Sequence, residues 1–221
     1  MSFAASTNSV VSPLAGSRDT TLADQGQFFV GLTPTVGTGI ITGASVQAFT
    51  ETTPYLVWFN SSATLSVYPM FIKTHLTVVG ATASVAENWT WTLDTGNRLT
   101  SGGTALTIAN TNMNSSTATQ SIITVGAITA TAATGARRII ANCVGKDTVI
   151  EVVHDTISFN FGGGYQVSKS STVANTTTPT YATFNLGPVV IGPLQSLVMV
   201  RWAASQTTGS TNEFECGWVE K

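Results

Sequence analysis

Few residues of this 221-residue chain have side chains suited to acid–base chemistry. His154 and Asp155 form the one adjacent imidazole–carboxylate pair, and His75 is the only other histidine. Neighbouring residues on a strand point to opposite faces, so His154 and Asp155 could converge on one substrate only from a turn. We interpret both as solvent-exposed turn residues. His75 shares a mixed strand face with Lys73, and we interpret it as a polar surface position.

Two carboxylates, Glu213 and Glu215, lie on one face of the last predicted strand. Retaining glycosidases need two carboxyl groups about 5 Å apart, whereas residues two apart on a strand are separated by about 7 Å. We therefore expect this pair to lie on a solvated edge face near the C-terminus.

Other catalytic patterns are missing from the sequence. The run Gly162–Gly164 lacks the Lys-Ser/Thr and the helix of a phosphate-binding loop, so a turn is the better interpretation. No G-x-S-x-G elbow occurs, and no cluster of His, Cys or carboxylates has metal-ligand spacing. We predict a protein that is not an enzyme, with no catalytic, cofactor-binding or metal-ligating residues and no cofactor.

The two cysteines, Cys143 and Cys216, do not form a C-x-x-C motif. A disulfide between them is open, but two buried free thiols are the favoured interpretation.

Composition excludes several classes of protein. Only 9% of the residues are charged, against about 25% in an average soluble domain, and the chain instead holds 38 Thr and 21 Ser. A net charge of −2 with nine basic residues gives no electrostatic footprint for nucleic acid. No apolar run reaches the roughly 20 residues of a membrane span. Because residues 1–16 lack a basic n-region and an apolar h-region, we expect no signal peptide.

The elements that would position these residues are strands. Thr, Val, Ile and aromatic residues are abundant and helix formers are scarce, so little helix is expected. In 64–79, alternation places Phe71, Lys73, His75 and Thr77 on one face and Ile72, Thr74, Leu76 and Val78 on the other. In 87–94, Trp89, Trp91 and Leu93 should face inward, and Asn88, Thr90, Thr92 and Asp94 outward.

The candidate segments are expected to supply roughly ten to twelve strands, without helical crossovers. Further strands are expected at 27–32, 46–50, 55–60, 105–109, 121–131, 138–144, 147–153, 156–161, 181–186, 189–191, 196–203 and 213–219. Pro69 should split 64–79 or place it at an edge, and Gly145–Asp147 should form a hairpin turn. This pattern predicts an all-β antiparallel β-sandwich, with the jelly roll as the expected variant.

The predicted domain organisation is an extended N-terminal arm over residues 1–25 and a single β-sandwich over residues 26–221. The arm is small and polar. It could be an unstructured terminus or a segment that orders against a neighbouring subunit.

Two segments resemble virion structural proteins of tailed bacteriophages. They are Asn97–Asn114 (NRLTSGGTALTIANTNMN) and Leu186–Lys221, which contains a Gly-Pro turn, an L-V-x-x-R-W strand and a terminal G-W-V-E-K. The resemblance covers about a quarter of the chain and brings no catalytic residues. It implies a jelly-roll or related sandwich that assembles on a capsid, commonly as a trimer. The expected location is the virion, assembled in the host cytoplasm.

Three functions follow as expectations. The first is a head decoration (cement) protein that binds itself and the major capsid protein or other virion proteins, without nucleic acid or membrane. The second is a carbohydrate-binding module of a phage fibre, which would use exposed members of Trp58, Trp89, Trp91, Trp202 and Trp218. The third is the shell protein of a small jelly-roll virus, which the lack of a basic arm disfavours. Tyr55, Trp58 and Phe59 beside Pro54 could be interface anchors or ordinary core.

Overall fold

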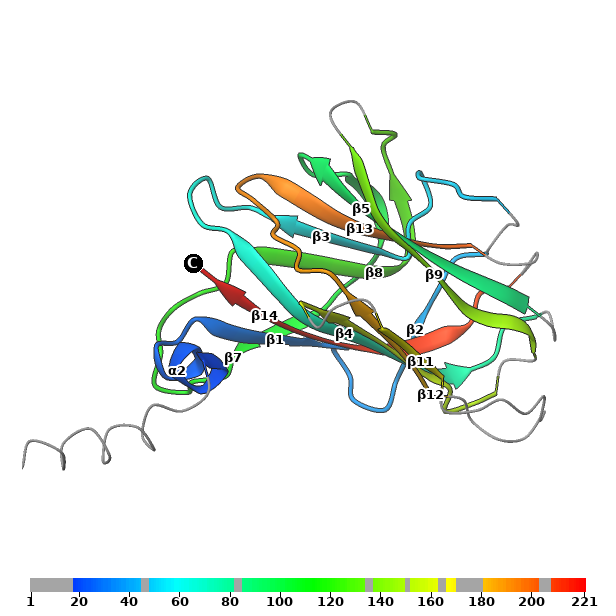
Figure 1. Ribbon diagram of the computed structural model, residues 1–221, viewed down its shortest axis with the longest axis horizontal. Helices are drawn as coiled ribbons and strands as arrows, with labels where there is room; N and C mark the ends of the chain where they lie inside the picture. The colour runs from blue at the N-terminus through cyan, green and yellow to red at the C-terminus, as the bar shows by residue number, and fades with distance from the viewer. Residues whose placement is uncertain are drawn as a thin grey trace, which may run out of the picture.

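The computed structural model describes residues 18–44, 48–81, 85–133, 137–149, 152–162, 166–169, 181–202 and 208–221. Within these residues the chain forms two β-sheets and one short helix (Figure 1). The expected β-sandwich is confirmed. The helix α2 (Arg18–Asp24) has seven residues, and no helix of the described residues is long and apolar enough to cross a membrane.

The larger sheet has eight strands in the order β11-β12-β10-β4-β14-β1-β7, with β2 also paired to β14. Neighbours in it are antiparallel except β10 and β12, which run parallel. Its strands are β1 (Phe28–Leu32), β2 (Ile40–Ile41), β4 (Val67–Val78), β7 (Thr107–Asn110), β10 (Thr156–Phe161), β11 (Gln166–Lys169), β12 (Tyr181–Leu186) and β14 (Thr211–Glu220).

The smaller sheet has six antiparallel strands in the order β6-β8-β3-β13-β5-β9. They are β3 (Leu56–Asn60), β5 (Val85–Thr95), β6 (Leu99–Ala105), β8 (Ser121–Ala130), β9 (Arg138–Val149) and β13 (Gln195–Trp202). A jelly roll has eight strands in two sheets. With eight and six strands and a parallel pair, the jelly-roll expectation is not confirmed.

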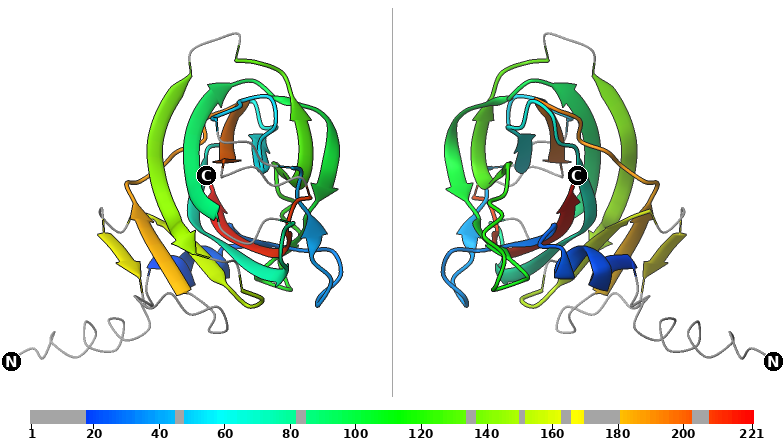
Figure 2. Two further views of the ribbon diagram at one scale, coloured as in Figure 1. Left: turned by 90° about the vertical axis from the view of Figure 1, so that its right-hand side faces the viewer. Right: turned by 90° about the vertical axis from the view of Figure 1, so that its left-hand side faces the viewer.

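The two sheets enclose one aromatic core. Figure 2 shows the strands curving around a common interior when the molecule is viewed from its ends. Alternate residues of each strand point inward, and four indoles, those of Trp58, Trp89, Trp91 and Trp218, are at most 2% exposed. The predicted inward faces are therefore confirmed for Ile72, Thr74, Leu76, Trp89 and Trp91, whereas Val78 at the end of β4 is 55% exposed and Leu93 is only partly buried.

Several local predictions are wrong or only partly tested. Residues 145–147 do not form a hairpin turn but continue β9, whose backbone pairs with β5 through an irregular register. Residues 48–50 form no strand, and 46–47 lie outside the described residues. Pro69 does not split β4. It lies past the point where pairing with β10 ends, beside a bulge on β14, so a missing N–H is tolerated there.

Part of the predicted extended arm is helical. Residues 1–17 lie outside the described residues, but α2 occupies Arg18–Asp24 and buries Leu22. The helix ends in a Schellman motif, because the amide of Gln27 donates to the Leu22 carbonyl and that of Gly26 to Ala23. Gly26 has the positive φ of 68° that this ending requires. The burial of Leu22 explains why the helix forms, and the Schellman motif at Gly26 explains where it ends.

The outer face of the six-stranded sheet carries a second, smaller apolar cluster. Val57, Ile128, Val198 and Val200 are buried there, with Phe49, Leu99 and Trp202 packed on them. The residues of β5 that were expected to face solvent are covered too: Thr90, Thr92 and Asp94 are buried.

Candidate functional site

A row of ionisable side chains crosses the outer face of the eight-stranded sheet at β4 and β14. These strands are antiparallel neighbours, and their register pairs His75 with Glu213 and Lys73 with Glu215. Residues two apart on a strand share a face, so all four side chains point away from the core. Sequence alternation placed Lys73 and His75 on one face of their strand, and Glu213 and Glu215 on one face of theirs. Only the pairing of the two strands brings these four side chains together.

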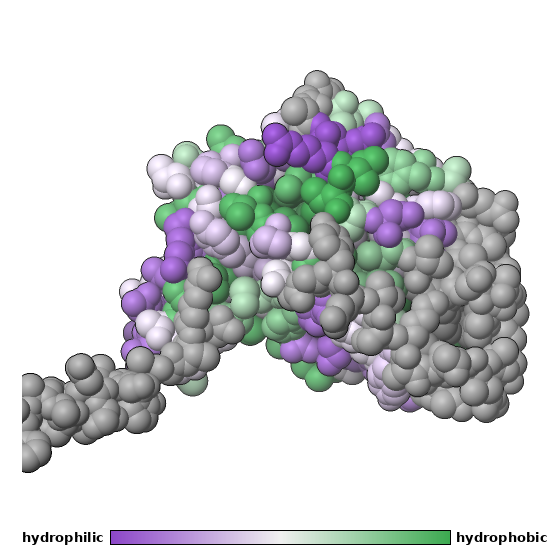
Figure 3. Space-filling model, in the orientation of Figure 1, coloured by the Kyte–Doolittle hydropathy of each residue, from purple (hydrophilic) through white to green (hydrophobic). Residues whose placement is uncertain are grey.

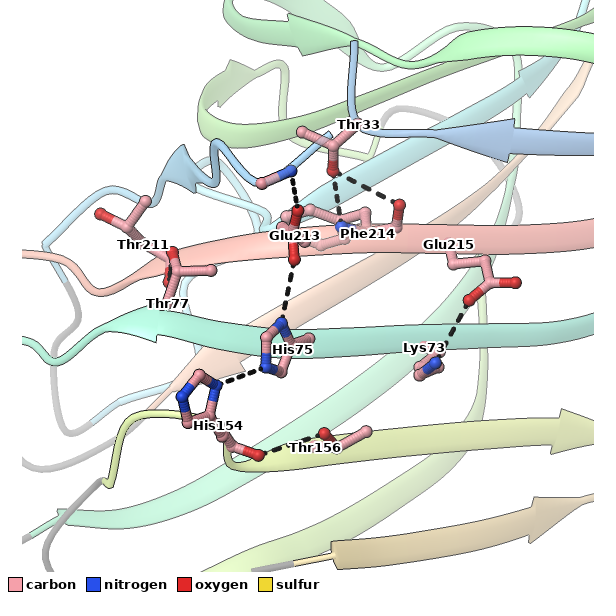
Figure 4. A network of polar contacts seen from close by, with 11 residues as sticks. Thr33, Lys73, His75, Thr77, His154, Thr156, Thr211, Glu213, Phe214 and Glu215 are labelled. Atoms are coloured by element: carbon pink, nitrogen blue, oxygen red, sulfur yellow. Dashed lines mark hydrogen bonds and ion pairs between the residues drawn. The ribbon is translucent and has the colours of Figure 1, made fainter. Parts of the chain in front are cut away.

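His75 is hydrogen-bonded on one side to Glu213. Its Nδ1–H donates to Glu213 Oε2 at 3.0 Å, and the backbone amide of Gly37, in the β1–β2 loop, donates to Glu213 Oε1 at 2.6 Å (Figure 4). The His75 and Glu213 side chains are 30% and 25% exposed. Glu213 therefore keeps the proton of a neutral His75 ring on Nδ1.

The other ring nitrogen of His75 meets the second histidine. His75 Nε2 lies 3.1 Å from His154 Nδ1, and one of the two nitrogens donates to the other (Figure 4). The rings are 13° from coplanar, with centroids 5.3 Å apart. Because the ring centroids are farther apart than the two nitrogen atoms, the rings meet edge to edge, and the two nitrogen atoms point at each other. This geometry suits a shared proton rather than a metal ion, which needs lone pairs that converge on a third point.

His154 reaches β4 from a strained turn. Its φ is +77°, a left-handed conformation that costs about 1–3 kcal/mol for a residue with a side chain. The turn is held by hydrogen bonds from the amide of His154 to the Leu76 carbonyl, from the amide of Leu76 to the Asp155 carbonyl, and from the amide of Val152 to the Asp155 carboxylate. The backbone pairing with β4 keeps the imidazole beside His75.

Lys73 and Glu215 form the second cross-strand pair, with Nζ 3.3 Å from Oε2. Both side chains are more than 40% exposed, so this ion pair contributes little to stability. Its positive charge lies beside Glu213.

The row forms the floor of a surface depression of about 330 Å³. Its rim is partly apolar and comes from β1 and the loop that follows, with Leu32 and Val36 both exposed. Thr33 anchors this loop to β14, because the amide of Phe214 donates to Thr33 Oγ1 at 2.7 Å.

The surroundings stabilise the charged form of Glu213. The hydrogen bond from His75 lowers the pKa of Glu213 most. Burial opposes it and raises the pKa, but the Gly37 amide and the charges of His75 and Lys73 lower it further, so the pKa lies below its ordinary value. Glu213 is therefore a carboxylate through the range in which histidines titrate.

These positions differ from the sequence interpretation in three respects. Glu213 and Glu215 are not on an edge strand, since β14 lies between β4 and β1. Asp155 is buried rather than exposed, because its carboxylate accepts the Val152 amide inside the turn. His154 is exposed as predicted, but it contacts His75, which is not an isolated surface residue.

The row can accept, hold and pass protons, but within the described part of the chain no hydroxyl or thiol is hydrogen-bonded to either histidine ring to complete a catalytic triad. The nitrogen that His75 would offer a substrate faces His154, and Thr156, the hydroxyl beside His154, donates to the His154 carbonyl. Among the described residues, no three His, Cys, Asp or Glu side chains are placed to hold a metal ion.

The cysteines and tryptophans lie elsewhere. Cys143 and Cys216 are buried free thiols, as expected. Burial raises the pKa of Cys143 to about 11 and that of Cys216 further, so both are protonated at neutral pH. Tyr55 and Trp58 belong to the core and are not surface anchors, and Phe59 is half-buried. Of the five tryptophans only Trp202 is partly exposed, and its Nε1–H donates to Thr90.

Comparison of the chain with models of known protein families, with curated protein sequences and with solved structures gives no match. The function must therefore be argued from the residues and their geometry.

Proposed function

We propose that this protein is a non-enzymatic structural component of a virion, a head decoration protein that binds the capsid shell as a homo-oligomer, with a trimer as the expected form. The resemblance of Asn97–Asn114 and Leu186–Lys221 to bacteriophage virion proteins suggests the setting. The observation that carries the proposal is the burial of several of the few charged side chains.

Six of the few charged side chains are buried. The sequence has twenty charged side chains, and six of them are buried in the described part of the chain: Glu87, Asp94, Arg98, Asp155, Arg201 and Glu220. Arg98 binds Asp94 with Nη1 2.7 Å from Oδ2, and Arg201 binds Glu87. These six charged side chains therefore do not add to the charge of the surface, in a chain that has 59 hydroxyl side chains of Thr and Ser.

A neutral hydroxyl surface suits a large interface between protein subunits. Ser and Thr lose little rotamer entropy on burial compared with Lys or Glu, and they avoid the desolvation cost of an ion. Figure 3 shows apolar side chains gathered in the area of the six-stranded sheet. The exposed apolar residues on or next to its strands include Ile122, Ile139 and Leu194, which would be covered in an assembly.

The segments that resemble virion proteins lie on strands at the sheet edges and in the middle of both sheets. Asn97–Asn114 contains β6 and β7, one edge strand of each sheet, and Leu106 between them is buried where the chain passes from one sheet to the other. The strand β6 is almost entirely exposed. An edge presented in this way offers backbone groups to a neighbour.

The sugar-binding alternative receives no support from the tryptophans. Stacking on a sugar needs an exposed aromatic face, and four of the five indoles are in the core. For the shell-protein alternative, the absence of a basic run in residues 1–25 still argues against packaging of a genome.

The proposal is tested on the virus particles encoded with this gene. Antibodies raised against the purified chain should label the outside of purified particles in electron microscopy, and the purified chain should co-sediment with particles that lack it. A monomer that stays in the supernatant with such particles would contradict the proposal.

A further inference from the structure

The contact between the two histidines joins distant parts of the chain and has an unusual proton requirement. His75 and His154 are 79 residues apart, and His75 and Glu213 are 138 apart. We propose that the contact of His75 with His154 is an acid-sensitive clasp, which fixes the Val152–Asp155 turn to β4 near neutral pH and releases it when both imidazoles carry a proton.

Proton counting is the first step of the argument. Glu213 accepts the Nδ1–H of His75, so the contact between His75 Nε2 and His154 Nδ1 can contain one proton. If His75 is the cation, it donates to a neutral His154, and if His154 is the cation, it donates to a neutral His75. One excess proton therefore keeps the contact.

A second excess proton has no compatible position. With both rings charged, an N–H on His75 would point at an N–H on His154 over a 3.1 Å separation. Two donors and two like charges then face each other, and the contact must open. Histidine is the side chain that ordinarily changes charge between about pH 5 and pH 8, so this is the pH range in which the contact is tested.

The neighbouring charged groups cannot offset the repulsion between two protonated imidazoles. From β14 only Glu213 and Glu215 face the pair, and Glu213 already binds His75, whereas Glu215 binds Lys73. From β4 the neighbouring charge is Lys73, which disfavours further positive charge. The β1–β2 loop, residues 33–39, contains no charged residue and contributes the Gly37 amide to Glu213. The Asp155 carboxylate is occupied with the Val152 amide on the buried side of the turn.

The turn is a suitable element to move. His154 adopts a positive φ of 77°, a strained conformation that the clasp supports together with the backbone hydrogen bonds of the turn. Two backbone hydrogen bonds between the turn and Leu76 remain. We therefore expect local opening at 152–155, beside the depression over β4 and β14, and not global unfolding.

Nuclear magnetic resonance on the full-length chain tests the clasp. Imidazole nitrogen shifts between pH 8 and pH 5 should show two coupled protonation steps, with Glu213 retaining the Nδ1–H of His75. The amide of His154 should shift in the second step only. Its exchange with solvent, corrected for the intrinsic pH dependence, should then accelerate about two- to tenfold, as expected for one weakened hydrogen bond. If both histidines become protonated while the His154 and Leu76 amides stay unchanged, the clasp is wrong.

Two variants and a matched control separate the clasp from general acid effects. His75→Gln keeps an N–H donor for Glu213 but cannot be charged, and His154→Asn tolerates a positive φ. Both should lose the acid response of the turn amides. Glu215→Gln removes the neighbouring ion pair and should keep the response. Persistence of the response in His154→Asn would overturn the proposal, and the wild-type nitrogen shifts decide it even if a variant does not fold.

Discussion

At the scale of single residues, several of the few charged side chains occupy buried, hydrogen-bonded positions. Asp94 and Arg98 are both buried on the outer face of the six-stranded sheet, where Arg98 also donates to the carbonyls of Thr131 and Glu51. Burial raises the pKa of Asp94, although Arg98, Thr92 and Arg137 act to lower it. Such a pair is costly to break from one side, because the remaining ion stays buried.

Arg98→Met is expected to lower the free energy of unfolding by about 3–5 kcal/mol at neutral pH. Without Arg98, the pKa of Asp94 rises further above its unfolded value. A carboxyl with a raised folded pKa destabilises the protein as pH rises through that pKa, so the loss should shrink toward pH 4.5. Urea unfolding at pH 7 and pH 4.5 measures this difference. Asp94→Leu combined with Arg98→Met should recover part of the stability. A loss that is equal at both pH values would contradict the assignment.

Glu220 ties the end of β14 to the start of β8, and among the described residues its partners are all uncharged donors. Its carboxylate accepts hydrogen bonds from Thr119 Oγ1, the Gln120 and Ser121 amides, Ser121 Oγ and the Trp218 indole, at 2.6–3.2 Å. Glu220→Ala should cost at least about 2 kcal/mol, since several buried donors lose their acceptor. Glu215→Ala on the same strand is the control, and it should cost less than about 1 kcal/mol. Similar midpoints of thermal unfolding for the two variants would refute this role.

At the scale of elements, the two sheets come together through short connecting pieces. The strand β2, which pairs with β14 of the larger sheet, lies against β8 of the smaller one at Gly126. Gly126 has a φ of +103°, and a Cβ there would lie 2.7 Å from Ile40 Cγ2 and 2.9 Å from the Ile41 carbonyl oxygen. The close approach of β2 and β8 therefore depends on a residue without a side chain.

Gly126→Ala is expected to destabilise the fold by more than Gly96→Ala. Both positions have a positive φ, but a Cβ at Gly96 would meet no atom within 4 Å. The Gly96 variant should lose about 1 kcal/mol from backbone strain alone, and the Gly126 variant should lose more, because β2 must also shift. Chemical denaturation of both proteins gives the comparison, and equal losses would show that β2 adjusts freely.

At the scale of the whole molecule, a β-sandwich with a neutral surface is expected to associate without help from ion pairs. Light scattering should report a homo-oligomer of the 23.0 kDa chain, with a trimer as the expected state. Because contacts between neutral side chains are not screened by salt, the oligomer should persist between about 0.05 M and 0.5 M NaCl. Dissociation at the higher salt concentration would indicate an interface built on charges, and a monomer at both concentrations would count against the proposed function.

The sequence by itself determined the class of the fold and the inward-facing residues. Alternation of apolar and polar residues is a local property of each strand, so most of the inward-facing residues of 71–78 and 89–93 followed from it. The scarcity of helix followed from composition, and the free thiols were the favoured interpretation of two cysteines that form no C-x-x-C motif. The turn at His154 also followed. The helix α2 did not, because its stability depends on the packing of Leu22 and on the glycine stop as much as on propensity.

Only the tertiary structure decided which strands are neighbours and what covers the outer faces. The register between β4 and β14 places His75 opposite Glu213, and the turn before β10 places His154 beside His75. In the same way Arg98 and Trp202 covered Asp94 and Thr90, which alternation had assigned to solvent. The physical reason is that a strand's own sequence fixes which side chains share a face. The partner across that face comes from distant segments, through hydrogen bonds between backbones that carry no sequence signal of their own.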